Sequence, residues 1–337
     1  MIERYLSEPN QPGLVVITGA SAGIGRACVR MFAKNGYDVA MIARGKEALE
    51  AAKKEVEALG RHAVFHIVDI ADAGAVDKAA AEIEQELGPI DVWVNNAMNS
   101  VFSPVKEMLP EEYKRVTEVT YLGQVYGALA ALKRMLPRNR GKIVFVGSAL
   151  AFRGIPLQSA YCASKHAIEG FYDSLRTELI HDKSKVQILT VHLPALNTTQ
   201  FGFVKSRLSR KARPMGTIFQ PEVAAEAILY GAQSNRRSIY VTWSTIQVII
   251  ASRLFPNLVD YVLARTGYEG QQTNDPENPN RKHNLWDPVP GAHGAHGEFD
   301  EQASGTSPQL WLTKNRGYVA SGVALALVGF LFGKNGA

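Results

Sequence analysis

Cysteine is scarce in this chain, which has only Cys28 and Cys162 among its 337 residues. Neither belongs to a CxxC pair or to a Cys/His pattern at metal-ligand spacing, so we expect no disulfide framework and no metal site. The first 13 residues carry three charges and no apolar run, which argues against a secretory signal. Together these absences favour a reducing, cytoplasmic setting.

Charge is also sparse and evenly spread: 20% of the residues are charged and the formal net charge is +5. This balance gives little support to a nucleic-acid-binding function. Hydrophobic residues make up 46% of the chain, as in folded globular proteins. Length and local composition predict a catalytic domain over residues 1–266, an irregular extension over 267–312 and an apolar C-terminal segment over 313–337.

Short apolar runs alternate with helical patterns through most of the chain. Seven runs have the length and composition of buried strands: 14–18, 37–43, 62–68, 90–96, 142–148, 186–194 and 238–243. We therefore expect an α/β fold, with a Rossmann-type, doubly wound, mainly parallel seven-stranded sheet and helices on both faces. In such sheets ligands bind beyond the carboxyl ends of the strands.

The first of these strands ends in a glycine-rich turn, TGASAGIG, directly before a helical pattern. Gly19, Gly23 and Gly25 would let the backbone turn sharply and approach a pyrophosphate, while the helix N-terminus would supply amide donors. The alternative is a turn that only packs the helix against the sheet. Its position after the first strand favours a nucleotide cofactor.

A tyrosine and a lysine, Tyr161 and Lys165, are spaced four residues apart in a helical pattern. This spacing places the two side chains on one helix face, where the ammonium would lower the pKa of the phenol. Ser148 ends the apolar run KIVFVGS, so a strand would deliver its hydroxyl to the same sheet edge. The three groups suit carbonyl chemistry, although such a Tyr/Lys pair also arises by chance.

Taken together, these motifs resemble the short-chain dehydrogenase/reductase family over about residues 12–245. The resemblance rests on TGASAGIG, on Asp69 after the third strand, on VNNA at 94–97, on Ser148, Tyr161 and Lys165, and on LPALNT at 193–198. It implies hydride transfer between a nicotinamide and a carbonyl or alcohol carbon. Tyr161 would exchange the hydroxyl proton, Lys165 would lower its pKa and hold the ribose, and Ser148 would bind the reacting oxygen.

The same resemblance implies a set of cofactor-binding residues in addition to Tyr161 and Lys165. They come from the glycine turn, the ends of the second to fourth strands and the proline-led segment: Gly19, Ser21, Gly23, Ile24, Gly25, Arg44, Asp69, Ile70, Asn96, Ala97, Pro194, Asn197 and Thr198.

Two positions depart from the family pattern. Met98 replaces the usual glycine after VNNA, and its side chain would either line the substrate pocket or point away as ordinary packing. Thr120 replaces the family's usual asparagine in the long central helix. We include Thr120 among the catalytic residues because its hydroxyl would anchor a water in the proton relay to Lys165.

Arg44, in the sequence MIARGKE, indicates the cofactor preference. A cation at the end of the second strand favours a 2′-phosphate, whereas an acid there favours the free ribose hydroxyls. We therefore expect NADP(H) over NAD(H). The alternatives are that Arg44 stacks on the adenine or faces solvent.

The segment 196–220 is expected to form a substrate lid. It mixes apolar residues with five basic ones, Lys205, Arg207, Arg210, Lys211 and Arg213. The cations would meet an anionic membrane or an acidic substrate, or they would simply face water. In the extension, Leu285 and Trp286 suggest a docking point, and the glycine-flanked His293 and His296 lack the partners of a metal site.

Residues 317–333 form an uncharged apolar run between Arg316 and Lys334. Its 17 residues are close to the minimum for a membrane-spanning helix, so we expect a C-terminal anchor on the cytoplasmic face of a membrane. A buried helix or an oligomer contact are the alternatives.

The sequence thus favours an NADP(H)-dependent oxidoreductase acting on a hydrophobic, lipid-like ketone, aldehyde or secondary alcohol, as a homodimer or homotetramer. The competing hypothesis is a catalytically weak NADP(H)-binding regulatory or scaffold protein on the same fold.

Overall fold

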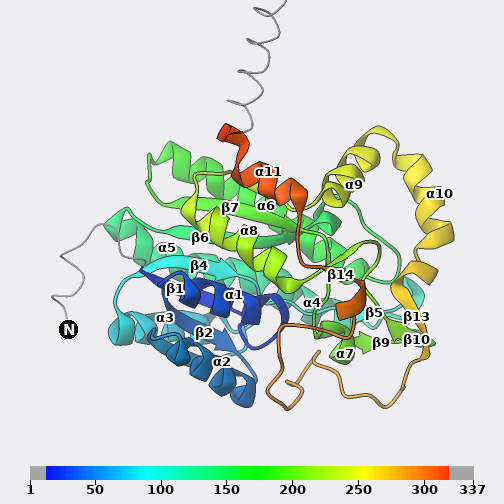
Figure 1. Cartoon of the computed structure of the whole chain (residues 1–337), viewed down its shortest axis with the longest axis horizontal. Coiled ribbons are helices and arrows are strands. Elements are labelled where there is room, and N and C mark those ends of the chain that lie inside the picture. Colours follow the sequence, from blue (N-terminus) through cyan, green and yellow to red (C-terminus); the bar gives the residue numbers. More distant parts are fainter. Residues whose placement is uncertain (1–12, 319–337) are drawn as a thin grey trace, which may run out of the picture.

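A computed structural model describes residues 13–318, and its centre is one seven-stranded parallel sheet (Figure 1). The strand order is β12-β7-β6-β4-β1-β2-β3. This confirms the predicted seven-stranded, doubly wound α/β fold. The strands are β1 (Leu14–Thr18), β2 (Asp38–Ala43), β3 (Ala63–Ile67), β4 (Ile90–Asn95), β6 (Lys142–Ser148), β7 (Gln187–Leu193) and β12 (Ser238–Tyr240).

Helices cover both faces of the sheet because successive strand residues point to opposite sides. One face packs against α1 (Gly23–Lys34), α2 (Lys46–Ala58) and α8 (Pro221–Gln233) in a core that includes Val15, Ile17 and Phe32. The other face packs against α3 (Ala73–Leu87), α5 (Gly123–Arg138) and α6 (Ser159–His181) around Leu14, Val16 and Trp93.

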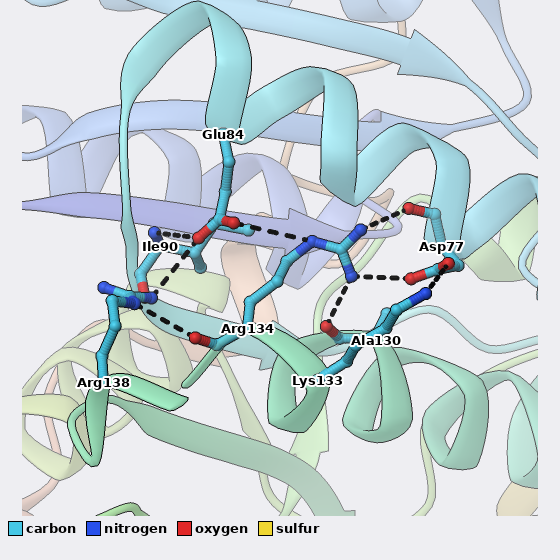
Figure 2. A network of polar contacts seen from close by, with 7 residues as sticks. All are labelled: Asp77, Glu84, Ile90, Ala130, Lys133, Arg134 and Arg138. Carbon is cyan, nitrogen blue, oxygen red and sulfur yellow. Dashed lines mark hydrogen bonds and ion pairs between the residues drawn. The ribbon is translucent and has the colours of Figure 1, made fainter. Parts of the chain in front are cut away.

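The long helical pattern predicted from residue 111 to 135 is broken by a π-helical turn. The helix α4 (Pro110–Thr117) runs into this turn at Glu118–Leu122 and then into α5. On its outer side, α5 is tied to α3 by the polar network of Figure 2, in which Arg134 reaches both Asp77, at 2.7 Å, and Glu84, at 3.8 Å. These ion pairs fix the helix that carries Thr120 and Gln124 beneath the sheet.

The segment after β7 is built from short elements rather than one long lid helix. The elements β8 (Ala195–Leu196), α7 (Gln200–Phe203), β9 (Lys205–Ser206), β10 (Arg210–Ala212) and β11 (Ile218–Phe219) follow one another. All four of these strands pair outside the main sheet: β9 with β5 (Val101–Phe102), β10 with β13 (Gln272–Pro276), and β11 with both β8 and β14 (Ala303–Ser304). The lid segment is therefore anchored at both ends.

The chain then forms a helical hairpin and a long wrapping extension. The hairpin consists of α9 (Trp243–Leu254) and α10 (Pro256–Thr266), and the extension returns to the sheet with β14 (Ala303–Ser304) and α11 (Pro308–Lys314). None of the helices within residues 13–318 is both long and apolar enough to cross a bilayer. Most of the predicted anchor, residues 319–333, lies outside the described residues.

Candidate active site

The glycine turn has the conformation that a close-approaching ligand requires. Gly19 and Gly23 have φ angles of 66° and 55°, in the left-handed region that favours glycine. A Cβ at Gly25 would lie 2.0 Å from the carbonyl oxygen of Gly19, so that position also needs glycine. The helix α1 begins at Gly23, which places its N-terminal amides at the carboxyl end of β1.

A pocket lies beyond the carboxyl ends of β1 to β4. Its lining includes most of the residues predicted to bind the cofactor: Gly19, Ser21, Gly23, Ile24, Arg44, Asp69, Ile70, Asn96, Ala97 and Thr198. Met98 also lines it, so its side chain reaches this pocket. Of the residues predicted to bind the cofactor, Gly25, Tyr161, Lys165, Pro194 and Asn197 are not among its lining residues.

The hydroxyl of Thr18 organises the junction between β1 and β4, a role that the sequence reasoning missed. It accepts hydrogen bonds from the backbone amides of Asn96 and Ala97, at 3.0 and 3.1 Å. The side-chain amide of Asn96 in turn donates from Nδ2 to the carbonyl of Thr18 at 2.9 Å. A polar residue at the end of an apolar central strand is the sequence signal that could have identified this role.

Ser148 and Tyr161 contact each other, as expected if they act on the same reacting oxygen. Ser148 lies at the end of β6 and hydrogen-bonds Tyr161, which lies in the first turn of α6. Burial raises the pKa of the Tyr161 phenol, and the hydrogen bond with Ser148 opposes this shift. The phenol of Tyr161 is therefore protonated at neutral pH and can act as a proton donor.

Lys165 lies one turn further along α6, with its Nζ 5.5 Å from the centre of the Tyr161 ring. Its ammonium donates to the carbonyl oxygen of Val146 at 2.7 Å, and the side chain is almost fully buried. Burial lowers the pKa of Lys165 to about 7, while the carboxylate of Glu169 opposes the change. Lys165 can thus gain or lose a proton near neutral pH.

Two side chains that the sequence reasoning missed flank this lysine. Gln124 donates to the same Val146 carbonyl at 3.4 Å, and its Oε1 is buried with no hydrogen-bond partner in the described part of the chain. Glu169 lies one turn beyond Lys165, and burial, together with the nearby Asp173, raises its pKa to about 7. The only sign of either residue in the sequence is that it lies one helical turn after a predicted one: Gln124 after Thr120, and Glu169 after Lys165.

Thr120 makes two hydrogen bonds with the loop after β4. Its fully buried hydroxyl donates to the carbonyl of Asn99 at 2.9 Å and accepts from the amide of the same residue at 3.1 Å. The hydroxyl therefore holds this loop, and its role in a proton relay to Lys165 stays a prediction. Gln124 is the polar residue of this helix that reaches the lysine's carbonyl partner.

Arg44 is held by the C-terminal extension. Its guanidinium donates to the backbone carbonyls of Asn284 and Trp286, both at 2.5 Å, and lies 4.0 Å from Asp69. Burial lowers the pKa of Arg44, and Asp69 opposes this shift. Two of the five guanidinium N–H groups are thus engaged, and the residue still lines the pocket.

The extension also supplies part of the pocket wall. Leu285 is fully buried between Val101, Val116 and Ala160, so the predicted docking point is present at this residue. The carbonyl of Leu285 accepts from Arg115, whose guanidinium also pairs with Asp69. Four extension residues line the pocket: Asn284, Pro288, Val289 and His293.

A polar cluster fastens the extension to the proline-led segment. The buried Asn197 donates to Asp300 at 2.8 Å and accepts from the amide of Phe299 at 3.0 Å. His296 bridges Glu222 and Asp300 at 3.0 and 2.8 Å, and although burial lowers its pKa, these hydrogen bonds raise it. Asn197 therefore holds the extension, and the residues of this segment that line the pocket are Thr198 and Thr199.

Thr199 was missed by the sequence reasoning, which stopped at Thr198. It lines the pocket, and its buried Oγ1 has no hydrogen-bond partner within residues 13–318. Such a hydroxyl is available to a ligand.

The five basic residues of the lid segment all have partners within the protein. Lys205 and Arg207 bind the buried Glu112, at 2.7 Å each. The other three pair with residues of the extension: Arg210 with Glu269, Lys211 with Asp275 and Arg213 with Gln302. This finding disfavours the interpretation of these cations as a free surface for lipid or for an acidic substrate.

Sequence comparisons support the chemistry that this geometry allows. A family model described as short chain dehydrogenase matches residues 13–207. The uncharacterized oxidoreductase YxnA of Bacillus subtilis is 33% identical over 282 residues, covering 83% of this chain and 79% of that protein. A fatty acyl-CoA reductase of Acinetobacter baylyi is 29% identical over 240 residues, covering 71% of this chain and 79% of its own.

Solved structures give a consistent result. An alcohol dehydrogenase of Thermococcus sibiricus in complex with 5-hydroxy-NADP has a TM-score of 0.59 and 27% identity, over 68% of this chain and 96% of that one. A metagenomic short-chain oxidoreductase in complex with NADP has a TM-score of 0.58 and 26% identity. The match covers 68% of this chain and 97% of that one.

Proposed function

Because this chain belongs to the short-chain dehydrogenase/reductase family of oxidoreductases, we propose that it transfers a hydride between NADP(H) and a hydrophobic ketone, aldehyde or secondary alcohol. One observation carries this proposal: Ser148, Tyr161 and Lys165 lie together at the end of β6 and the start of α6, at the same carboxyl edge of the sheet as the glycine turn. The roles assigned to these residues below are part of the proposal.

The residues present fit a dinucleotide cofactor. Gly19 and Gly23 leave a space that a Cβ would fill, the amides of α1 point out of its N-terminus, and Thr199 offers an unpartnered buried hydroxyl. Asp69, Ile70 and Arg44 would hold the adenosine end, and Asn96, Ala97 and Thr198 the middle and the nicotinamide end. When bound, the nicotinamide supplies or accepts the hydride.

The remaining chemistry is proton transfer and orientation. In carbonyl reduction, Tyr161 would give its phenolic proton to the developing alkoxide, and Ser148 would donate a hydrogen bond to the same oxygen. Lys165 in its charged form would stabilise the phenolate left on Tyr161. In alcohol oxidation the same proton would move back to Tyr161.

Arg44 supports NADP(H) because three of its N–H groups remain for a 2′-phosphate. The two neighbours with bound NADP or its derivative are consistent with this preference. The name of the Acinetobacter relative, a fatty acyl-CoA reductase, agrees with a lipid-like carbonyl.

The competing function is cofactor binding without turnover, in a regulatory or scaffold protein. The observation in its favour is that the Thr120 hydroxyl is occupied by Asn99. The catalytic domain in either case would act in the cytoplasm, and we propose a homodimer or homotetramer.

A panel of ketones and aldehydes assayed with NADPH tests the proposal. We expect turnover of medium- and long-chain carbonyls, reduced by about 10²- to 10⁴-fold in Tyr161→Phe with NADPH binding retained. Tyr126→Phe, in α5, is the matched control and should keep wild-type activity. Tight NADPH binding with no turnover across the panel would favour the regulatory function.

A further inference from the structure

The hairpin of α9 and α10 exposes an unusual amount of apolar surface. In Figure 1 the two helices project from the body of the molecule, with α10 at its margin. The helix α10 has no buried residue at all. Large apolar side chains that would normally be covered are instead open to solvent along both helices.

These side chains are spaced by helical repeats within each helix. On α9, Trp243, Ile250 and Leu254 recur after seven and four residues, and on α10, Leu258, Tyr261 and Val262 recur after three and four, with Phe255 at the turn between the two helices. The most exposed members are Trp243 at 55%, Ile250 at 52%, Leu254 at 65%, Phe255 at 59%, Leu258 at 61% and Tyr261 at 71%. Val248 and Val262 add to the set, at 38% and 49%. We call this set of eight residues the hairpin face.

The opposite side of the hairpin is fixed to the protein. Ile249 is buried, the guanidinium of Arg253 lies over the ring of Phe152, and Arg153 pairs with Asp260. Phe152 and Arg153 belong to the loop that directly follows Ser148. The hairpin face therefore looks outward from a support that adjoins the proposed catalytic serine.

The charges around the hairpin face are mainly positive. Arg253 and Arg265 lie on the hairpin, and its one acid, Asp260, is neutralised by Arg153. Arg316 adds a cation after α11, whereas Lys314 pairs with Glu226. An apolar stripe bordered by cations and carrying Trp and Tyr is the composition of a surface that lies on anionic lipid.

The end of the described chain lies on the same side. Gln309 in α11 accepts a hydrogen bond from the amide of Thr242, the residue before α9, at 2.8 Å. In Figure 1, α11 and α9 lie along the same edge of the molecule. The 19 residues after Tyr318 begin beyond α11 and contain most of the uncharged apolar run 317–333.

We propose that the hairpin face is a docking surface for an anionic lipid bilayer. It places α9 and α10 flat on the membrane. The loop after Ser148 then lies close to the bilayer, where an apolar carbonyl compound dissolved in lipid is concentrated. A second copy of this chain is the competing occupant of the face.

Site-specific labelling of the full chain tests the proposal. Cys28 and Cys162 are buried, so a single introduced surface cysteine can be labelled selectively with an environment-sensitive NBD probe. Tyr261→Cys reports on the hairpin face. Ile180→Cys, on α6 and 63% exposed, is the matched control. The ligands are vesicles of phosphatidylcholine with or without phosphatidylglycerol.

We expect phosphatidylglycerol vesicles to shift the emission of the label at position 261 to the blue and to leave the label at 180 unchanged. A triple variant carries Leu254→Ser, Leu258→Ser and Tyr261→Ser. It should bind these vesicles at least about ten-fold more weakly than the wild type, because three apolar side chains are no longer transferred from water to lipid on binding. A matched triple, Val105→Ser, Leu129→Ser and Ile180→Ser, should partition as the wild type does.

Three results would overturn the proposal. The first is that the chain sediments with vesicles while the label at 261 stays in water, which would assign binding to the C-terminal segment alone. The second is that the emission of the label shifts with protein concentration in the absence of vesicles, which would assign the face to a second copy. The third is that the wild-type chain does not bind vesicles at all.

Discussion

The backbone amide of Gly23 donates a hydrogen bond of 3.0 Å to the carbonyl oxygen of Gly294. This contact joins the first residue of α1 to the C-terminal extension. It is reinforced nearby by an isolated bridge between Thr198 and His296 and by the hydrogen bond from the amide of Gly297 to the carbonyl of Asn197. The extension thus closes the side of the pocket on which a pyrophosphate would lie.

The first prediction concerns this closure. A Cβ at Gly297 would lie 2.4 Å from the carbonyl oxygen of Thr198, so Gly297→Ala should push the extension away from the pocket. We expect NADPH to dissociate about ten-fold faster, as measured by stopped-flow fluorescence. Gly305→Ala, in the same extension but with no atom within 4 Å of the added Cβ, is the control. Equal dissociation rates for the two variants would show that the extension does not retain the cofactor.

The second prediction concerns cofactor choice. Arg44→Ala removes the cation proposed to bind the 2′-phosphate and also frees the carbonyls of Asn284 and Trp286. Loosening of the extension should weaken both cofactors, whereas loss of the phosphate contact should weaken NADPH alone. We therefore expect the ratio of kcat/KM for NADPH to that for NADH to fall about ten-fold or more. Lys46→Ala, an exposed neighbour, should keep the ratio, and an unchanged ratio in Arg44→Ala would exclude Arg44 as the determinant.

The sequence predicted the sheet well because each strand carries its own local signal. The runs ending at Thr18 and Ser148 are almost wholly apolar and fully buried, so their apolar pattern and length were sufficient to predict buried strands. The glycine turn was equally local, since its φ angles demand glycine. Leu285 was recognised as a docking residue, but its site beside Val101 and Val116 was not, because those contacts join positions more than 160 residues apart.

The neighbours of Lys165 were hidden for a related reason. Gln124 is an ordinary polar residue within a helical pattern, and only the packing of α5 against β6 brings it to the carbonyl that Lys165 binds. Glu169 lies one turn from Lys165 on α6, but its burial, which raises its pKa, is set by the packing of that helix. Thr120 shows the converse case. Its position in the chain suggested a proton relay, but the π-helical turn directs its hydroxyl to the backbone of Asn99.

The third prediction concerns the pH dependence of carbonyl reduction. Burial lowers the pKa of Lys165 to about 7, and the Glu169 carboxylate raises it. Because charged Lys165 is proposed to stabilise the Tyr161 phenolate, kcat/KM should fall as pH rises through the pKa of the lysine. Glu169→Gln removes the opposing charge, so the fall should occur at lower pH than in the wild type. Glu178→Gln, exposed on the same helix, should leave the profile unchanged, and identical profiles for all three proteins would remove Glu169 from the mechanism.

The fourth prediction concerns the anchor of the lid. Burial alone would raise the pKa of Glu112, but hydrogen bonds from Arg207, the Leu109 amide and Lys205 lower it to about 2. Glu112→Gln leaves both cations without their carboxylate, so we expect a loss of about 2 to 3 kcal/mol in the free energy of unfolding at pH 7. Because the lid is tied to α4 through this residue, KM for the carbonyl substrate should rise as well.

The pH dependence separates the ion pairs from a general packing defect. A carboxyl group whose pKa is lowered by folding stabilises the protein at pH values above its unfolded pKa, and this contribution is lost as pH falls through the folded value. The difference in unfolding free energy between wild type and Glu112→Gln should therefore be largest above pH 4.5 and shrink as pH approaches 2. Urea unfolding at several pH values measures it, with the exposed Glu111→Gln as the control. A difference that stays constant with pH would mean that Glu112 acts through packing, not through its charge.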